Sequence, residues 1–117
     1  ILTANGDLNG VFASSEASSL GAIQAIQSRG LAGKVRLITM DFSDAHVEAL
    51  EAGVIDVMLV QDPFKLGYEA VKSLAEKLKG KTPVKRMDLP VREIVKADLA
   101  KPEIRTLLQP DWMKKKP

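Results

Sequence analysis

The apolar residues of this chain alternate between short continuous runs and stretches with helical spacing. The runs typical of buried β-strands cover residues 11–13, 35–40 and 54–60. The first helical stretch repeats Leu20, Ile23 and Ile26 and ends at Gly30, which can adopt the left-handed conformation of a helix stop. Because strands alternate with helices of this length, the pattern predicts right-handed crossover units and a parallel sheet.

Helix-start signals mark the later helices. Ser43 or Asp44 can cap a helix after the second run. Asp62 and Pro63 form a strong opening for another helix, since the acid caps it and proline suits its first turn. The apolar stripe that follows has helical spacing and contains Leu66, Ala70, Val71, Leu74 and Leu78. The spacing therefore predicts a helix over residues 62–79.

The remaining pattern is less regular. Residues 87–95 predict a fourth strand interrupted by Pro90, which suits an edge strand or a bend. Pro102 opens a last short helix. Residues 111–117, DWMKKKP, are typical of a solvated tail and not of an arm that binds nucleic acid.

The composition argues against several classes of protein. The 117 residues are the usual size of one domain, with 45% hydrophobic and 27% charged residues. A net charge of +2 and an aromatic content of 4% give no support for binding to nucleic acid. Cysteine is absent, so we expect neither disulfides nor a thiolate metal site.

The sequence carries no sign of membrane insertion or of a leader. No apolar run approaches the roughly 20 residues that span a bilayer, and no signal peptide is visible. The sequence begins at Ile1 without a methionine. We therefore expect either a processed chain or a piece of a longer protein.

Polar side chains follow each of the three apolar runs, where strands of a parallel sheet would end. Ser14 and Ser15 follow the first run, Asp41 the second and Gln61 the third. Ligands of open parallel sheets bind beyond the carboxyl ends of the strands. A carboxylate accepts from two hydroxyls and a carboxamide both donates and accepts, so this set suits a sugar or polyol. It contains no nucleophile–base pair, so we expect binding without catalysis, cofactor or metal.

Each of these residues also has a purely structural interpretation. Asp41 can begin an Asx turn into the next helix, and Gln61 can satisfy backbone groups of a loop. Ser14 or Ser15 can cap a helix, a role compatible with ligand contact. His46, the single histidine, is expected on the surface or near a helix cap, without partners for a metal.

Two stretches carry a family resemblance, FASSEASSLGAIQAIQSRGL and VRLITMDFSDAHVEALEAGVIDVMLVQDPFKLGYEAVKSLAEKLKG. With the ending VKADLAKPEIRTLLQP, they resemble the carboxyl-terminal part of ribose- and galactose-type periplasmic sugar-binding proteins. These proteins are the receptors of bacterial ABC sugar importers. The likeness covers most of the chain, from about residue 3 to residue 109.

The resemblance implies a three-layer α/β fold, a parallel sheet flanked by helices, as an incomplete lobe of a type I periplasmic binding protein. Residues 1–61 would form the portion of the carboxyl-terminal lobe with ligand-facing strand ends. Residues 62–117 would hold a hinge crossing, a helix of the opposite lobe, the final strand and the tail. The resemblance also implies a periplasmic or extracytoplasmic location, a small sugar or polyol ligand and a membrane permease as partner.

The resemblance extends to individual site residues. Asp41 matches an Asp that contacts sugar hydroxyls, and Gln61 matches a Gln that contacts sugar at a hinge crossing. Ser15 lies where ribose-type proteins usually carry Asn, and Phe42 lies where Gly is common. Serine is shorter than asparagine and has one donor fewer, which argues against ribose itself.

The resemblance also implies that an amino-terminal lobe is missing. That lobe would supply the facing wall of the cleft, so we expect this chain alone to bind sugar weakly. A truncated sheet leaves strand edges exposed, so we also expect self-association by strand pairing or segment exchange.

Two other functions are open to the same sequence. The effector-binding core of a lactose-repressor-type transcription regulator shares this fold, and would need a helix-turn-helix ahead of the chain. Such regulators usually show a VGFDD-like strand end and a proline-rich turn, whereas this chain has ITMDFSDAHVEAL. A phosphoacceptor domain is disfavoured, because it needs a further acidic pair and a lysine at strand ends that this chain lacks.

Overall fold

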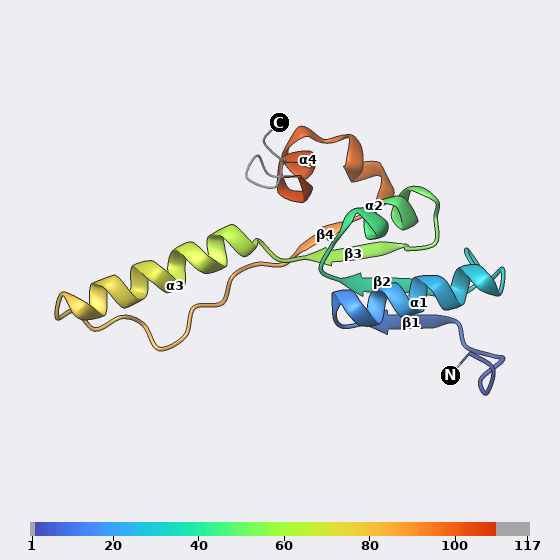
Figure 1. Ribbon diagram of the computed structural model, residues 1–117, viewed down its shortest axis with the longest axis horizontal. Helices are drawn as coiled ribbons and strands as arrows, with labels where there is room; N and C mark the ends of the chain where they lie inside the picture. The colour runs from blue at the N-terminus through green and yellow to red at the C-terminus, as the bar shows by residue number, and fades with distance from the viewer. Residues whose placement is uncertain (1, 110–117) are drawn as a thin grey trace. The chain divides into compact units, whose positions relative to one another are not determined.

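The structure is a computed structural model that describes residues 2–109, so the predicted tail at residues 111–117 lies outside the described residues (Figure 1). The elements in chain order are β1 Gly10–Ala13, α1 Glu16–Ser28, β2 Arg36–Met40, α2 Asp44–Glu51, β3 Val57–Val60, α3 Pro63–Leu78, β4 Arg92–Ile94, the 3₁₀ helix η1 Lys96–Ala100 and α4 Pro102–Leu108. The described residues up to Val60 and from Arg92 onward form one compact unit, and Gln61–Val91 forms another. Assignment of these units to the lobes of a receptor stays a prediction.

The first unit contains one four-stranded sheet in the order β1-β2-β3-β4. β1 pairs with β2 in parallel, with Ala13 opposite Thr39, and β2 pairs with β3 in parallel, with Met40 opposite Leu59. The predicted α/β fold with a parallel sheet is therefore confirmed for the first three strands. β4 is an antiparallel edge strand, shorter than predicted because it begins two residues after Pro90.

The hydrophobic core of this unit lies on one face of the sheet. Inward-facing strand residues such as Leu37, Met58 and Ile94 have no exposed surface. They share one cluster with residues of three helices, namely Ile23 and Ile26 of α1, Ala49 and Leu50 of α2, and Ile104 and Leu108 of α4. Figure 1 shows α1 along β1 and β2, which it contacts. The alternation along each strand directs every second side chain into this layer.

The opposite face of the sheet is covered by no described helix of this unit. Phe12 and Ile38, which are cross-strand partners on that face, are 56% and 37% exposed. Val57, the partner of Ile38 on β3, is only partly buried. The described residues of this unit thus form the sheet and one of its two flanking layers, as expected for an incomplete three-layer lobe.

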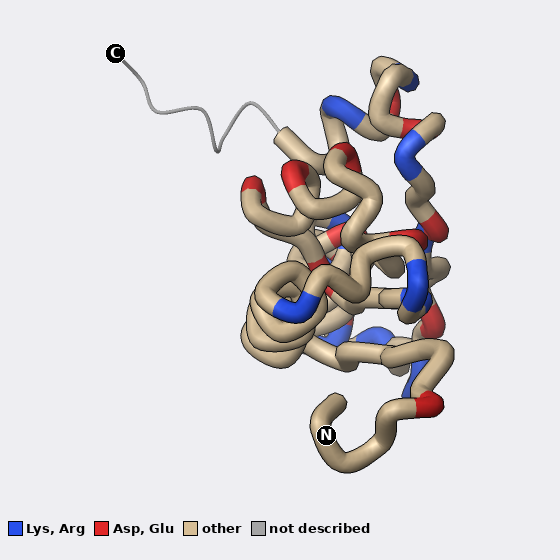
Figure 2. Tube along the Cα trace, turned by 90° about the vertical axis from the view of Figure 1, so that its right-hand side faces the viewer, with Lys and Arg blue, Asp and Glu red and all other residues tan. Residues whose placement is uncertain are grey.

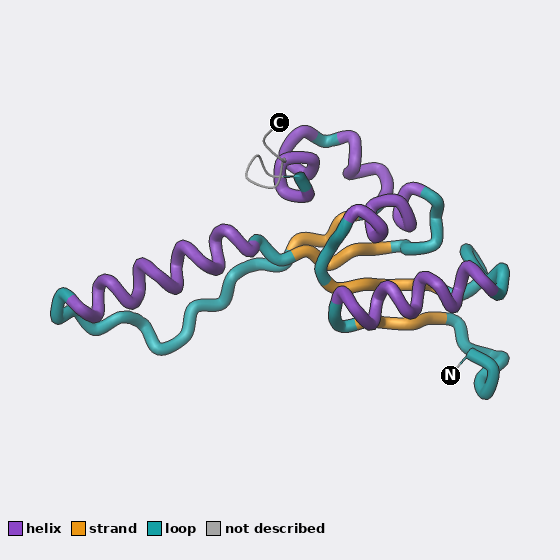
Figure 3. The backbone as a smooth tube through the Cα atoms, in the orientation of Figure 1, coloured by secondary structure: helices purple, strands orange, loops and turns teal. Residues whose placement is uncertain are grey.

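The second unit consists of α3 and the loop that returns from its end (Figure 3). Asp62 caps the helix, since its Oδ1 accepts from the Lys65 backbone N–H at 2.9 Å, and Pro63 occupies the first helical position. This helix start agrees with the prediction. None of the α3 residues is buried, and Val71 and Leu78 of the apolar stripe are 69% and 81% exposed.

Lys and Arg are interspersed with Asp and Glu along the part of the trace visible in Figure 2. Across residues 2–109, the structure contains no helix whose length and apolar character would allow it to cross a membrane.

Candidate functional site

The carboxyl ends of β1 and β2 lie side by side, as the parallel register requires. Ser19, a buried residue of α1, lies within hydrogen-bond distance of both strand ends. Its Oγ donates to the Ser15 carbonyl at 2.8 Å and lies 3.4 Å from the Ala13 carbonyl and 3.5 Å from the Met40 carbonyl. The start of α1 and the ends of two strands are therefore held at one edge of the sheet.

Ser15 is the N-cap of α1. The Ser18 backbone N–H donates to Ser15 Oγ at 3.4 Å, and the Ser15 N–H donates to Ser18 Oγ at 3.1 Å, which completes a capping box. The capping interpretation of Ser15 is therefore confirmed. Its side chain remains exposed, so a hydroxyl lone pair is still accessible beside the strand end.

Asp41 directly follows β2 and has a left-handed backbone, with φ of 68°. Asp tolerates this conformation better than most residues. Its N–H donates to the Leu59 carbonyl at 2.9 Å, which extends the β2–β3 ladder by one bond. Its carboxylate accepts no hydrogen bond from the described residues, so the Asx turn is not formed. The half-buried carboxylate keeps its acceptor sites for another partner.

Gln61 is the residue after β3 and the first residue of the second unit. Its side chain is exposed, and it forms no hydrogen bond within residues 2–109. The loop-satisfying role that the sequence allowed is therefore not seen. Ligand contacts by Asp41, Gln61 and Ser15 stay predictions.

His46 is buried, and the expected surface position is wrong. Its side chain has no exposed area because it shares the inner face of α2 with Ala49 and Leu50. The spacing of these three residues is the sequence signal that could have shown its burial. The expected nearness to a cap is confirmed, since Nδ1 lies 2.8 Å from Oγ of Ser43, the N-cap of α2.

The electrostatic surroundings of His46 link it to the strand ends. Burial lowers the pKa of the imidazole below its usual range, while the negative charges of Glu16 and Asp41 act in the opposite direction. These two carboxylates belong to the start of α1 and the end of β2. Sequence reasoning missed this group.

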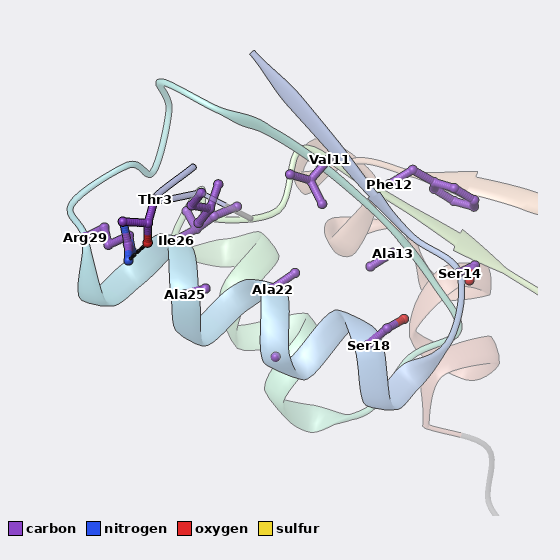
Figure 4. Close-up of a pocket in the computed structure, with 12 residues that line it drawn as sticks. Thr3, Val11, Phe12, Ala13, Ser14, Ser18, Ala22, Ala25, Ile26 and Arg29 are labelled. Carbon is purple, nitrogen blue, oxygen red and sulfur yellow. Dashed lines mark hydrogen bonds between the residues drawn. The ribbon is translucent and has the colours of Figure 1, made fainter. Parts of the chain in front are cut away.

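A groove of about 460 Å³ lies between β1 and α1 (Figure 4). Ser14 and Ser18 line one end, and Arg29 lines the other, where its Nη2 donates to Thr3 Oγ1 at 2.6 Å. The small residues Gly21, Ala22 and Ala25 form its helical wall. Neither Ser15 nor Asp41 lines this groove, so it is separate from the predicted ligand contacts.

The side chains predicted to contact a ligand differ from those of a metal centre. No group of three or more metal-ligating side chains occurs in the part of the chain that the structure describes. The predicted contacts are instead one carboxylate, one carboxamide and one hydroxyl. These groups can hold a ligand rich in hydroxyls through charge-assisted and neutral hydrogen bonds.

Comparisons with known proteins agree with this architecture. The family described as "Periplasmic binding protein domain" matches residues 1–82, which is more than half of the chain. The fructose import binding protein FruE of Bifidobacterium longum is 33% identical over 79 residues. That match covers 68% of this chain and 24% of the relative.

Solved structures give the same result. A carbohydrate transporter solute binding protein from Agrobacterium radiobacter, in complex with D-arabinose, has a TM-score of 0.83 and 33% identity over 92% of this chain and 37% of its own. A solute binding protein from Agrobacterium vitis, bound with α-D-tagatopyranose, has a TM-score of 0.85 and 27% identity over 92% of this chain and 36% of its own. This chain spans 24% to 32% of the length of the curated relatives that it matches. It belongs to the periplasmic binding protein domain family.

Proposed function

We propose that this chain is part of the carbohydrate-binding component of a bacterial ABC sugar importer. It acts outside the cytoplasm, where it binds a small sugar or polyol and delivers it to a membrane permease. The observation that carries the proposal is the free carboxylate of Asp41 directly after an inner strand of the parallel sheet. Three relatives support the ligand class. One is named for the import of fructose, and two solved structures hold D-arabinose and α-D-tagatopyranose.

Three residues bind the ligand in this proposal. Asp41 accepts hydrogen bonds from two neighbouring sugar hydroxyls, because an ionised carboxylate is an acceptor at both oxygens. Gln61 donates to one hydroxyl and accepts from another, and Ser15 supplies a third contact from the start of α1. None of these groups needs to react, so the protein binds its ligand without changing it.

The other wall of the cleft comes from chain outside these residues. The relatives are about three to four times as long as the matched segment, since it covers 24% to 37% of them. A sugar held on one side only keeps most of its water and gains little affinity. The test therefore uses the full-length gene product that contains these residues.

The test is a thermal-shift screen of that protein against pentoses, hexoses and polyols, repeated with Asp41→Ala. One ligand class should raise the melting temperature by several degrees, since a ligand at 100 times its Kd stabilises by about 2.7 kcal/mol. Asp41→Ala should remove most of that rise and leave the ligand-free melting temperature nearly unchanged, because the carboxylate has no hydrogen-bond partner among the described residues.

Asp88→Ala is the matched control. Asp88 is an exposed carboxylate paired with Arg86 in the second unit, and its loss should leave the ligand-induced rise intact. The proposal is wrong if no sugar or polyol stabilises the protein, or if Asp41→Ala responds to the ligand as the unsubstituted protein does.

A further inference from the structure

His46 is a fully buried histidine at the start of α2. It lies in the first turn of α2 with no exposed surface, and it is the single histidine of the chain. Nδ1 is paired with Ser43, but Nε2 has no hydrogen-bond partner in the described residues. A buried polar atom without a partner costs free energy, and the contact with Ser43 is the one hydrogen bond that this ring makes within the described residues.

The contact with His46 changes the hydrogen bonding of Ser43, the N-cap of α2. As the N-cap of α2, Ser43 would ordinarily accept a backbone N–H with its hydroxyl, as Ser15 and Asp62 do in their helices. It makes no such bond, and its Oγ lies 2.8 Å from His46 Nδ1 instead. Its carbonyl accepts from the His46 and Val47 N–H groups at 3.0 and 3.1 Å. The Ser43 hydroxyl is therefore paired with the imidazole and not with a backbone N–H of α2.

The bond to Ser43 acts on the turn that carries Asp41. Only Phe42 separates the two residues, and Asp41 holds a left-handed backbone that non-glycine residues rarely adopt. One end of this turn is fixed where the Asp41 N–H donates to the Leu59 carbonyl at 2.9 Å. The other end is held by the contact of Ser43 with a ring that is fully buried.

The direction of the hydrogen bond between Ser43 and His46 depends on which ring nitrogen carries the proton. Glu16 and Asp41 are the charged groups that act on the imidazole, one from the start of α1 and one from the end of β2. With the ring proton on Nε2, the Ser43 hydroxyl donates to Nδ1, whereas with the proton on Nδ1 the ring would donate to the hydroxyl.

We propose that His46 is a positioning residue for the Asp41–Ser43 turn. Its neutral ring carries the proton on Nε2 and accepts a hydrogen bond from the Ser43 hydroxyl at Nδ1. This bond holds the turn and, with it, the Asp41 carboxylate. The inference rests on the proposed function for its effect on ligand binding. Its effect on the turn does not depend on any ligand.

Two NMR measurements on the full-length protein test the ligand-free part at neutral pH. Long-range ¹H–¹⁵N correlation of the imidazole, identified by its loss in His46→Asn, should show the Nε2–H tautomer. A left-handed residue has a short distance between its own N–H and Hα, so Asp41 should show a strong intraresidue cross-peak. His46→Leu should weaken or broaden that cross-peak, and His46→Asn, which keeps a polar atom near the Nδ1 position, should restore it in part.

Ser43→Ala provides a second route that leaves the buried ring in place. It removes the hydroxyl and should shift the Asp41 resonances as His46→Leu does, even if the leucine variant does not fold. Unchanged amide resonances at Leu37 and Ile94 in the core confirm that the sheet is intact. An Asp41 cross-peak of full strength in a folded Ser43→Ala variant, or an Nδ1–H tautomer, would overturn the proposal.

The sugar screen separates this inference from the proposed function. If a sugar binds, Ser43→Ala should lower its affinity by roughly fivefold to tenfold, as loss of one positioning hydrogen bond predicts. If no sugar binds while the Asp41 signals respond as expected, the proposed function fails and the positioning role stands. If sugar binds equally well to Ser43→Ala and the Asp41 signals do not move, the positioning role fails alone.

Discussion

At the scale of single residues, we expect the buried His46 ring to govern how stability depends on pH near neutrality. His46 Nε2 and Thr39 Oγ1 are buried without a hydrogen-bond partner among the described residues. Thr39 does not titrate, but His46 does, and its pKa in the folded state is lowered by burial. Because the chain has one histidine, this ring is the one side chain whose usual pKa lies near neutrality.

The lowered pKa predicts that the free energy of unfolding falls in mild acid. The unfolded chain binds a proton on His46 near its usual pKa of about 6.5, whereas the folded chain binds it only at lower pH. The contribution of His46 to the free energy of unfolding is therefore fully present above about pH 6.5. It falls as the pH drops toward the pKa of the folded state, by at most about 1.4 kcal/mol per pH unit. Urea unfolding of this chain between about pH 7.5 and pH 5.5 measures this fall in the free energy of unfolding.

The histidine-free variant is the control for this slope. His46→Asn should have lower stability at neutral pH but a nearly flat profile over the same interval, since carboxylates titrate well below it. Parallel profiles for the two proteins would show that His46 does not set the pH dependence.

At the scale of elements, α3 differs from the other long helix in what stabilises it. α1 buries Ser19, Ile23 and Ile26, so tertiary packing supports its thirteen residues. α3 has sixteen residues and buries none of them. Isolated helices of this length are marginal in water, so α3 depends on its cap and on intrinsic propensity.

This difference predicts unequal hydrogen exchange within one chain. In the 117-residue chain, amides of α3 should exchange orders of magnitude faster than those of Leu37 and Ile94 in the sheet. Asp62→Ala should speed exchange in α3 by about fivefold, because a lost N-cap costs about 1 kcal/mol. Mass spectrometry of deuterated peptides measures both effects.

Asp88→Ala, which removes a carboxylate of the same unit that caps no helix, should leave α3 exchange unchanged. Equal protection of α3 and the sheet would mean that the helix is packed in solution, and would contradict the prediction.

The sequence predicted elements well where a local signal existed. The helix starts at Ser15, Asp62 and Pro102 have caps or prolines, and each lies where it was expected. The fourth strand was placed too early because 87–95 has β-like composition, whereas pairing with β3 starts only at Arg92. Its antiparallel direction depends on the path of the chain through the second unit, which no local pattern encodes.

The candidate site was predictable only in part, for a related reason. Parallel topology follows from element order, so the placement of Asp41 after an inner strand could be predicted. The helical spacing of His46 with Ala49 and Leu50 carries the signal of its burial, but histidine is polar and is not counted in a pattern of apolar positions. The left-handed backbone of Asp41 has no glycine to mark it in the sequence.

At the scale of the whole chain, apolar surface is left uncovered in both units. On the first unit, the free edge of β1 adjoins the exposed face with Phe12 and Ile38. On the second, Phe64, Val71 and Leu78 are each more than two-thirds exposed. Soluble monomers rarely expose contiguous apolar surface together with an unprotected strand edge.

We therefore expect this 117-residue chain to self-associate through the edge of β1. Strand pairing would satisfy the unpaired backbone groups of that edge and cover Phe12 at the same time. Light scattering coupled to size exclusion should show mass rising with concentration toward a dimer or larger species. Phe12→Glu should shift this association to higher concentration, because a charge on an edge strand opposes pairing.

Leu78→Glu is the matched control, since it places the same charge on the most exposed apolar residue of α3, 81% exposed, in the unit that has no described strand. It should leave the association constant within about twofold if the strand edge drives assembly. Stronger loss of association in Leu78→Glu than in Phe12→Glu would assign assembly to the helix stripe instead. A monodisperse monomer of the unsubstituted chain at every concentration would contradict the prediction, because both uncovered surfaces would then be tolerated in water.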